Sequence, residues 1–88
     1  MRAELTGGSL LLRFGRQFGP AEAERLTATI RSFAPLSQLI LDFSDVRDLQ
    51  DSACGMLAAT LAASGAHQVV LRGLTRHQSR MLKYLGVT

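Results

Sequence analysis

The sequence predicts a small α/β domain in which helices cover a mixed β-sheet. Two short apolar runs, residues 39–41 and 69–71, indicate strands buried on both faces, which is the pattern of a parallel sheet. An alanine-rich helical segment lies between them, and such a strand–helix–strand unit closes with a right-handed crossover into a parallel pair. The chain has 88 residues, so we expect one domain over residues 1–88.

The first half of the chain predicts a β-hairpin followed by a helix. Residues 2–6 alternate weakly, residues 9–15 form the returning strand, and Gly7-Gly8 between them is a two-residue hairpin signal. Pro20 suits the first position of a helix, where its missing N–H is not needed, and Pro35 ends that helix. The helix carries one apolar stripe at helical spacing, formed by Ala23, Leu26, Ile30 and Phe33.

The second half predicts two more helices and gives the order β-β-α-β-α-β-α. Residues 42–50 are polar and turn-like, with Val46 and Leu49 expected to point inward. A helix over residues 52–64 is capped by Gly65. Thr75 is the expected N-cap of the last helix. The expected apolar face and stop of that helix are Met81, Leu82, Leu85 and Gly86.

Composition excludes several classes of protein. Hydrophobic residues make up 47% of the chain and charged residues 19%, which is ordinary for a globular domain and argues against disorder. One cysteine rules out an internal disulfide and a multi-cysteine zinc site, and we expect a cytoplasmic protein. Residues 52–71 are uncharged over the length of a membrane span, but their polar content favours a buried helix and strand over insertion. No targeting segment is visible.

The most informative segment is residues 39–57, LILDFSDVRDLQDSACGML. A buried strand leads into a short acidic loop, and the loop ends at Asp51-Ser52, where a helix begins. The first turn of a helix has unpaired N–H groups and a partial positive charge, so a phosphate on Ser52 would be well placed. Local chemistry alone favours the simpler interpretation that Asp51 or Ser52 is the N-cap of this helix.

The segment resembles a STAS domain, the fold of anti-sigma-factor antagonists and of the cytoplasmic domains of sulfate transporters. The family pattern is an apolar strand ending in Asp, a loop, and then Asp-Ser-Ser-Gly or Asp-Thr-Ala-Gly opening a helix. Asp42 and Asp51-Ser52-Ala53 match it. The resemblance covers nearly the whole chain and includes the entry into the first helix at residues 15–26 and the tail at residues 65–85, with its closing Leu-Gly-Val.

The resemblance implies a non-catalytic protein-binding module of bacterial signalling and transcription regulation. In partner switches, such a domain binds an anti-sigma factor that is itself a kinase, and phosphorylation of a hydroxyl at the start of the second helix breaks the complex. Ser52 is then the candidate phosphoacceptor. An alternative is an accessory STAS subunit that binds the ATPase of an ABC transporter. Either way the expected partner is an ATPase. This chain itself is expected to have no cofactor and no enzymatic activity. The implied contact set is Asp48, Gln50, Asp51, Ser52, Ala53 and Gly55.

The chain departs from the family pattern at three places. Ala53 stands where antagonists often carry a second, phosphorylated hydroxyl, and Cys54 replaces the usual glycine, with Gly55 one place late. Residues 16–18, Arg-Gln-Phe, replace a stretch that is often acidic. The Asp-Ser-Ala motif is closer to the transporter-subunit version than to Asp-Ser-Ser.

Other candidate sites have simpler interpretations. Cys54 lacks a positioned base and is expected to be a small core residue, and His67 and His77 are expected at the surface without a metal-ligand spacing. The four aspartates at positions 42, 45, 48 and 51 lack the spacing of a calcium loop, and Gly7-Gly8 lacks the pattern of a phosphate-binding loop. One basic stripe lies on the last helix, and we expect it to be a solvated face in preference to a nucleic-acid or partner contact. The stripe consists of Arg76, Arg80 and Lys83.

Overall fold

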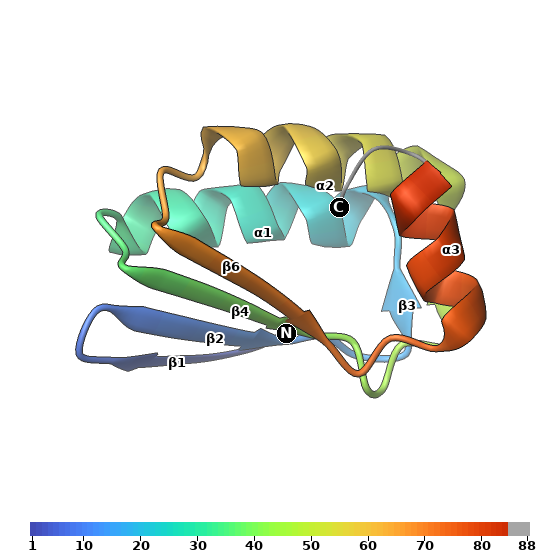
Figure 1. Ribbon diagram of the computed structural model, residues 1–88, viewed down its shortest axis with the longest axis horizontal. Helices are drawn as coiled ribbons and strands as arrows, with labels where there is room; N and C mark the ends of the chain where they lie inside the picture. The colour runs from blue at the N-terminus through green and yellow to red at the C-terminus, as the bar shows by residue number, and fades with distance from the viewer. Residues whose placement is uncertain (85–88) are drawn as a thin grey trace.

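A computed structural model of the chain describes residues 1–84. Helices lie on one side of a mixed sheet, with α3 at one end of it (Figure 1). The elements in chain order are β1 (Arg2–Thr6), β2 (Ser9–Arg13), β3 (Gln17–Phe18), α1 (Pro20–Phe33), β4 (Gln38–Asp42), β5 (Asp48–Leu49), α2 (Asp51–Ala63), β6 (Gln68–Arg72) and α3 (Arg76–Tyr84).

The main sheet has the strand order β1-β2-β4-β6. β1 and β2 form the antiparallel hairpin, in which Gly7 and Gly8 both have positive φ, as the tight turn requires. β2, β4 and β6 are parallel, so their carboxyl ends meet at one edge of the sheet. The hairpin and the parallel strand–helix–strand unit are therefore confirmed, although the returning strand stops at Arg13 instead of residue 15.

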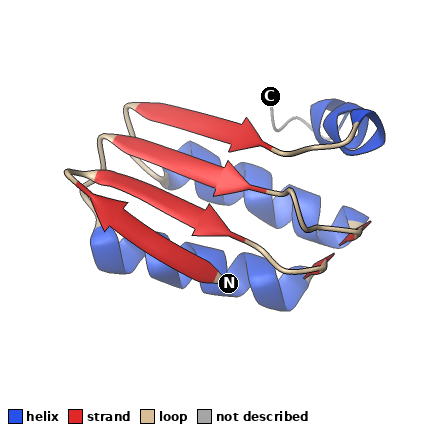
Figure 2. Ribbon diagram, turned by 90° about the horizontal axis from the view of Figure 1, so that it is seen from below, coloured by secondary structure: helices blue, strands red, loops and turns tan. Residues whose placement is uncertain are grey.

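Only one face of the sheet is covered within the described residues, so the prediction of strands buried on both faces is wrong. α1 and α2 lie side by side over one face, and the view from below shows the other face without a helix (Figures 1 and 2). In β4, Leu39 and Leu41 face the helices and are fully buried, whereas Ile40 is half-buried. In β6, Val69 is 37% exposed because this strand is at the edge of the sheet.

The uncovered face is made compatible with water by polar side chains around its apolar centre. The Ser9 hydroxyl donates to Gln38 Oε1 over 2.9 Å, and Gln38 Nε2 donates to Gln68 Oε1 over 3.3 Å. These bonds run across β2, β4 and β6 at the end where the three strands begin. A short apolar run in a strand cannot distinguish this half-covered arrangement from full burial.

α1 begins as the sequence predicts. Pro20 is its first residue, and the backbone N–H of the N-cap Gly19 donates to Glu22 Oε1 over 2.8 Å. Ala23, Leu26 and Ile30 are buried, but Phe33 is 38% exposed, so the apolar stripe ends one turn early. Thr27 of α1 and Thr60 of α2 share a hydroxyl hydrogen bond of 2.7 Å where the two helices pack.

A second, two-stranded sheet joins the starts of α1 and α2. β3 and β5 pair in parallel, with Phe18 opposite Leu49. The N–H of Arg47 donates to the carbonyl of Arg16 over 2.7 Å, and the N–H of Gln50 donates to the carbonyl of Phe18 over 3.0 Å. The sequence does not predict this sheet, because two-residue strands are too short to produce a periodic pattern.

The last helix is capped as expected. The N–H of Gln78 donates to the Thr75 hydroxyl over 3.1 Å, and the N–H of Thr75 donates to Gln78 Oε1 over 3.0 Å. Leu82 is fully buried and Met81 half-buried. The predictions for Leu85 and Gly86 lie outside the described residues. Across residues 1–84, no helix has both the length and the apolar character needed to span a membrane.

Candidate protein-binding site at the start of α2

Ser52 is exposed in the first turn of α2. The helix begins at Asp51 and its N-cap is Gln50, which makes no side-chain capping bond. The prediction that Asp51 or Ser52 serves as the N-cap is therefore wrong, since both residues lie inside the helix and point to solvent. The Ser52 hydroxyl forms no hydrogen bond within the described residues, so no intramolecular contact has to break for it to be modified.

Five of the six predicted contact residues lie at least partly at the surface, and the sixth is buried. Asp48, Asp51, Ser52 and Gly55 are exposed, and Gln50 is half-buried. Ala53 is fully buried. Because a buried methyl group presents no surface to a partner, Ala53 does not fit the contact set and is better described as part of the core.

Gly55 is an exposed glycine in the interior of a helix. A Cβ built at this position meets nothing within 4 Å. Glycine in a helix costs roughly 0.5–1 kcal/mol relative to alanine, and the packing of this domain provides no reason for it. Space for the close approach of another backbone is a physical reason for glycine on an exposed helical face.

Gln50 fixes the site to the rest of the fold. Its carbonyl accepts hydrogen bonds from the Ala53 N–H at 3.0 Å and from the Cys54 thiol at 3.5 Å. Its side chain lies over Gly19, where an added Cβ would approach Nε2 to 2.9 Å. The start of α2 is thus held against the start of α1, which makes the exposed turn at Asp51 and Ser52 a preorganised surface.

The acidic loop begins at Asp42, which is only 4% exposed at the end of β4. Its Oδ1 accepts hydrogen bonds from the Ser44 hydroxyl at 2.5 Å and the Ser44 N–H at 2.9 Å, and its Oδ2 lies 3.3 Å from Arg72 Nε. The Ser44 hydroxyl, then the Ser44 N–H, and the Arg72 guanidinium lower the pKa of Asp42 below its ordinary value of 3.8, against an opposing effect of burial.

We expect Asp42 to make the domain sensitive to acid. A carboxyl group whose pKa is lower in the folded state stabilises the fold above its unfolded pKa, and this stabilisation is lost as the pH falls through the folded value. Below about pH 4, the native protein should therefore lose stability more steeply than Asp42→Asn. Urea unfolding followed by circular dichroism between about pH 6 and pH 2 measures this difference. Parallel curves for the two proteins would contradict the role of Asp42.

The remaining aspartates do not form an ion-binding cluster. Asp45 lies 3.3 Å from Arg13 Nε in an exposed ion pair. In the part of the chain that the structure describes, no three His, Cys, Asp or Glu side chains come together in a group that could hold a metal ion. Asp48 and Asp51 are exposed and have no ion pair among residues 1–84.

Cys54 has the properties of a core residue. It is fully buried, and burial, with a smaller effect of the Asp51 charge, raises the pKa of its thiol above the ordinary value of 9.0. A raised pKa disfavours the thiolate, which is the nucleophilic form. His67 and His77 are exposed, as predicted.

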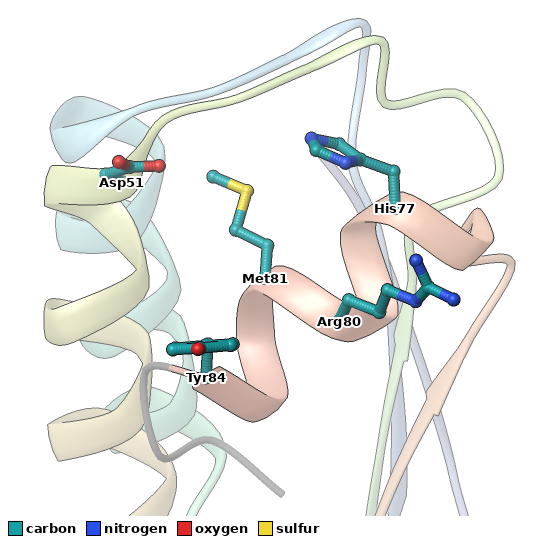
Figure 3. A pocket seen from close by; sticks show the side chains of 5 residues that line it. All are labelled: Asp51, His77, Arg80, Met81 and Tyr84. Atoms are coloured by element: carbon teal, nitrogen blue, oxygen red, sulfur yellow. The ribbon is translucent and has the colours of Figure 1, made fainter.

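The sequence did not predict the groove between this site and α3. One hollow of about 530 Å³ is lined by Asp51 on one side and by His77, Arg80, Met81 and Tyr84 of α3 on the other. A second hollow of about 460 Å³ shares Asp51, His77 and Met81 with it and extends along residues 46–49. In Figure 3, Asp51 points toward α3, and the Met81 side chain extends into the space between the two helices.

Gln78 connects the two sides of this groove. It is 5% exposed, and its Nε2 donates to the Val46 carbonyl over 3.0 Å while its Oε1 accepts from Thr75. Thr75 followed three residues later by Gln78 is a capping-box spacing, which was the available sequence signal. The bond to Val46, 32 residues away, depends on the tertiary fold and has no local signal.

A mixed sheet with two long helices on one face and a third helix at its end is the arrangement of a STAS-type fold. The structure is similar to that of the anti-sigma factor antagonist SpoIIAA in its unphosphorylated form, with a TM-score of 0.78 and 15% identity over 98% of this chain and 80% of that one. It is also similar to the Bacillus cell fate determinant SpoIIAA in its phosphorylated form, with a TM-score of 0.74 and 14% identity over 98% and 83%. The predicted STAS fold is thereby confirmed.

A third similar structure is that of Mglu, with a TM-score of 0.72 and 18% identity. The match covers 85% of this chain but only 20% of Mglu, so the likeness concerns a small part of that larger chain. No protein-family model matches the sequence, and no curated protein is significantly similar to it.

Proposed function

We propose that this protein is a non-catalytic binding module of the anti-sigma-factor-antagonist type, which binds a partner protein through the start of α2. The observation that carries the proposal is the exposed, unbonded Ser52 hydroxyl in the first turn of a fold shared with SpoIIAA, a protein known in unphosphorylated and phosphorylated forms. The contact surface consists of Asp48, Gln50, Asp51, Ser52 and Gly55.

Phosphorylation of Ser52 fits a switch because its effects in the free protein and in a complex are opposite. In the free protein, the phosphate would face solvent at the positive end of α2, where anions are favoured. In a complex, the same group would add about 1.5–2 negative charges next to Asp51 inside a closed interface. The modification would therefore weaken the complex and leave the domain folded.

The proposal predicts that Ser52→Asp weakens partner binding at least tenfold, which corresponds to roughly 1.4 kcal/mol. The partner is first captured from source-cell lysate with the native protein and identified by mass spectrometry. Its affinity is then measured by calorimetry with purified proteins. We expect an ATPase, either an anti-sigma factor kinase or the ATPase of a transporter, and incubation with ATP shows whether it phosphorylates Ser52.

Ser32→Asp is the matched control, because Ser32 is an exposed serine near the other end of α1. It should change the affinity less than twofold, within the scatter of surface substitutions. Gly55→Gln adds bulk without charge and should also weaken the complex. The thermal midpoint of Ser52→Asp should not fall, since a carboxylate in the first turn favours the helix. Equal affinities for the native protein and Ser52→Asp would overturn the proposal.

A further inference from the structure

α3 presents a basic face that forms no ion pair within the described residues. Arg76, Arg80 and Lys83 are all exposed, and none forms an ion pair within residues 1–84. The sequence contains no acidic residue after Asp51, so α3 itself carries positive charge only. Helix faces that only contact solvent usually carry both positive and negative side chains. A face with positive charge alone is therefore a reason to look for an acidic partner.

Exposed apolar surface lies beside this charge. Tyr84 is 93% exposed, and Met81 is half-buried along the groove. Figure 3 shows both residues on α3 with Arg80, whose guanidinium points away from Asp51. Tyrosine, methionine and arginine are the residue types enriched in protein–protein interfaces, where arginine and tyrosine often contribute most of the binding energy.

Two contacts fix the position of α3 beside the loop that leads to Ser52. Leu82 is fully buried on the opposite side of α3, and Gln78 bonds α3 to the loop through the Val46 carbonyl. The groove then runs without interruption from α3 to Asp51, which is the residue before Ser52. A protein that covers Ser52 and extends toward α3 would therefore meet both surfaces in a fixed geometry.

We infer that the exposed face of α3 and the adjoining groove form a second contact for the partner, and that the partner presents an acidic surface there. This inference rests on the proposed function and adds the chemistry of the partner. Charge complementarity favours an acidic protein surface against α3, because Arg76, Arg80 and Lys83 are exposed there and the helix has no acidic residue. The opposite wall of the groove carries charges of both signs, with Arg47 beside Asp48 and Asp51, and titration with a DNA duplex tests nucleic acid as the occupant. An acidic partner surface would also repel a phosphate on Ser52, in agreement with the proposed switch.

An NMR titration of the isotope-labelled protein tests the surface without the partner. The probes are poly-L-glutamate and, separately, a mixed-sequence DNA duplex at the same salt concentration. Amide shifts should concentrate on residues 76–84 with poly-L-glutamate, and should shrink as salt shortens the screening length from about 10 Å at 0.1 M to about 3 Å at 1 M. Shifts spread over all arginines, or tighter binding of DNA at α3, would overturn the inference.

Charge reversal on α3 supplies the second measurement. Arg76→Glu combined with Arg80→Glu should weaken poly-L-glutamate binding at least tenfold, and glutamate at position 76 suits the start of the helix. The matched control, Arg25→Glu with Arg31→Glu, makes the same charge change on α1 and should reduce the affinity at most twofold. A comparable loss in both double variants would show a nonspecific effect of net charge and exclude a site on α3.

The captured partner separates the two proposals. If Ser52→Asp weakens the complex and the α3 reversal does not, the proposed function stands and this inference fails. If the α3 reversal weakens the complex and Ser52→Asp does not, the acidic-partner surface stands and the Ser52 switch fails.

Discussion

Replacing Phe43 with alanine is expected to lower the free energy of unfolding by about 3–5 kcal/mol. Phe43 is fully buried, and its ring centroid lies 5.0 Å from that of Phe14 and 5.5 Å from that of Phe18. The three rings come from the segments that follow β2 and β4 and from β3, so their contacts join the two sheets. An 88-residue domain has roughly 4–13 kcal/mol of stability in total, so this single loss is a large fraction of it.

Urea denaturation followed by circular dichroism measures the loss, and Phe33→Ala is the control. Phe33 undergoes the same substitution at a position that is 38% exposed on the last turn of α1. Its removal leaves little cavity, so we expect a cost below about 1.5 kcal/mol. If the two variants were equally destabilised, the aromatic cluster would not be the centre of the core.

The parts of the fold that the sequence predicts correctly are those with a local chemical cause. Gly7-Gly8 permits a turn with two positive φ values, Pro20 suits a helix start, and Thr75 caps the last helix. Each of these signals operates within about four residues and needs no tertiary partner. The order of the long elements follows from them.

The errors arise where tertiary contacts decide the outcome. The pairing of β3 with β5 depends on residues about 30 positions apart, as does the bond from Gln78 to Val46. The apolar run at residues 39–41 looks the same in a strand covered on one face or on both, and the structure shows Ile40 half-buried on the uncovered face. Three consecutive apolar residues do not show whether helices cover one face of the strand or both.

The candidate site also combines features that have a local sequence signal with features that depend on the tertiary fold. Ser52 at a helix start could be predicted from the sequence, but which neighbours face outward could not. Asp51 and Gly55 are exposed, whereas Ala53 between them is buried, because the helix turns this position toward the core. The groove alongside α3 depends on how the loop after β4 and the turn after β6 approach each other.

The close contact between these two segments predicts the second large loss of stability, which we expect from Gly73→Ala. Gly73 lies between β6 and α3 with a φ of +75°, a backbone conformation that residues other than glycine rarely adopt. An added Cβ would stand 2.6 Å from the Ser44 nitrogen and 2.8 Å from its Cα, and the Ser44 backbone is held by Asp42. The conformational cost and the clash together should destabilise the domain by about 2–4 kcal/mol.

Gly65→Ala separates the two contributions, because Gly65 has a similar φ of +70° and an added Cβ would meet nothing within 4 Å. It should cost about 1–2 kcal/mol, the conformational part alone. Urea unfolding of both variants gives the cost of the clash as their difference. Because Gly73 lies where the segment leading into α3 touches the loop after β4, its variant should also shift the amide resonances of residues 44–51 and 76–84, which Gly65→Ala should leave in place. Equal costs for the two variants would show that the loop yields without penalty, and that the close contact between Gly73 and Ser44 does not fix the position of α3 beside the Ser52 site.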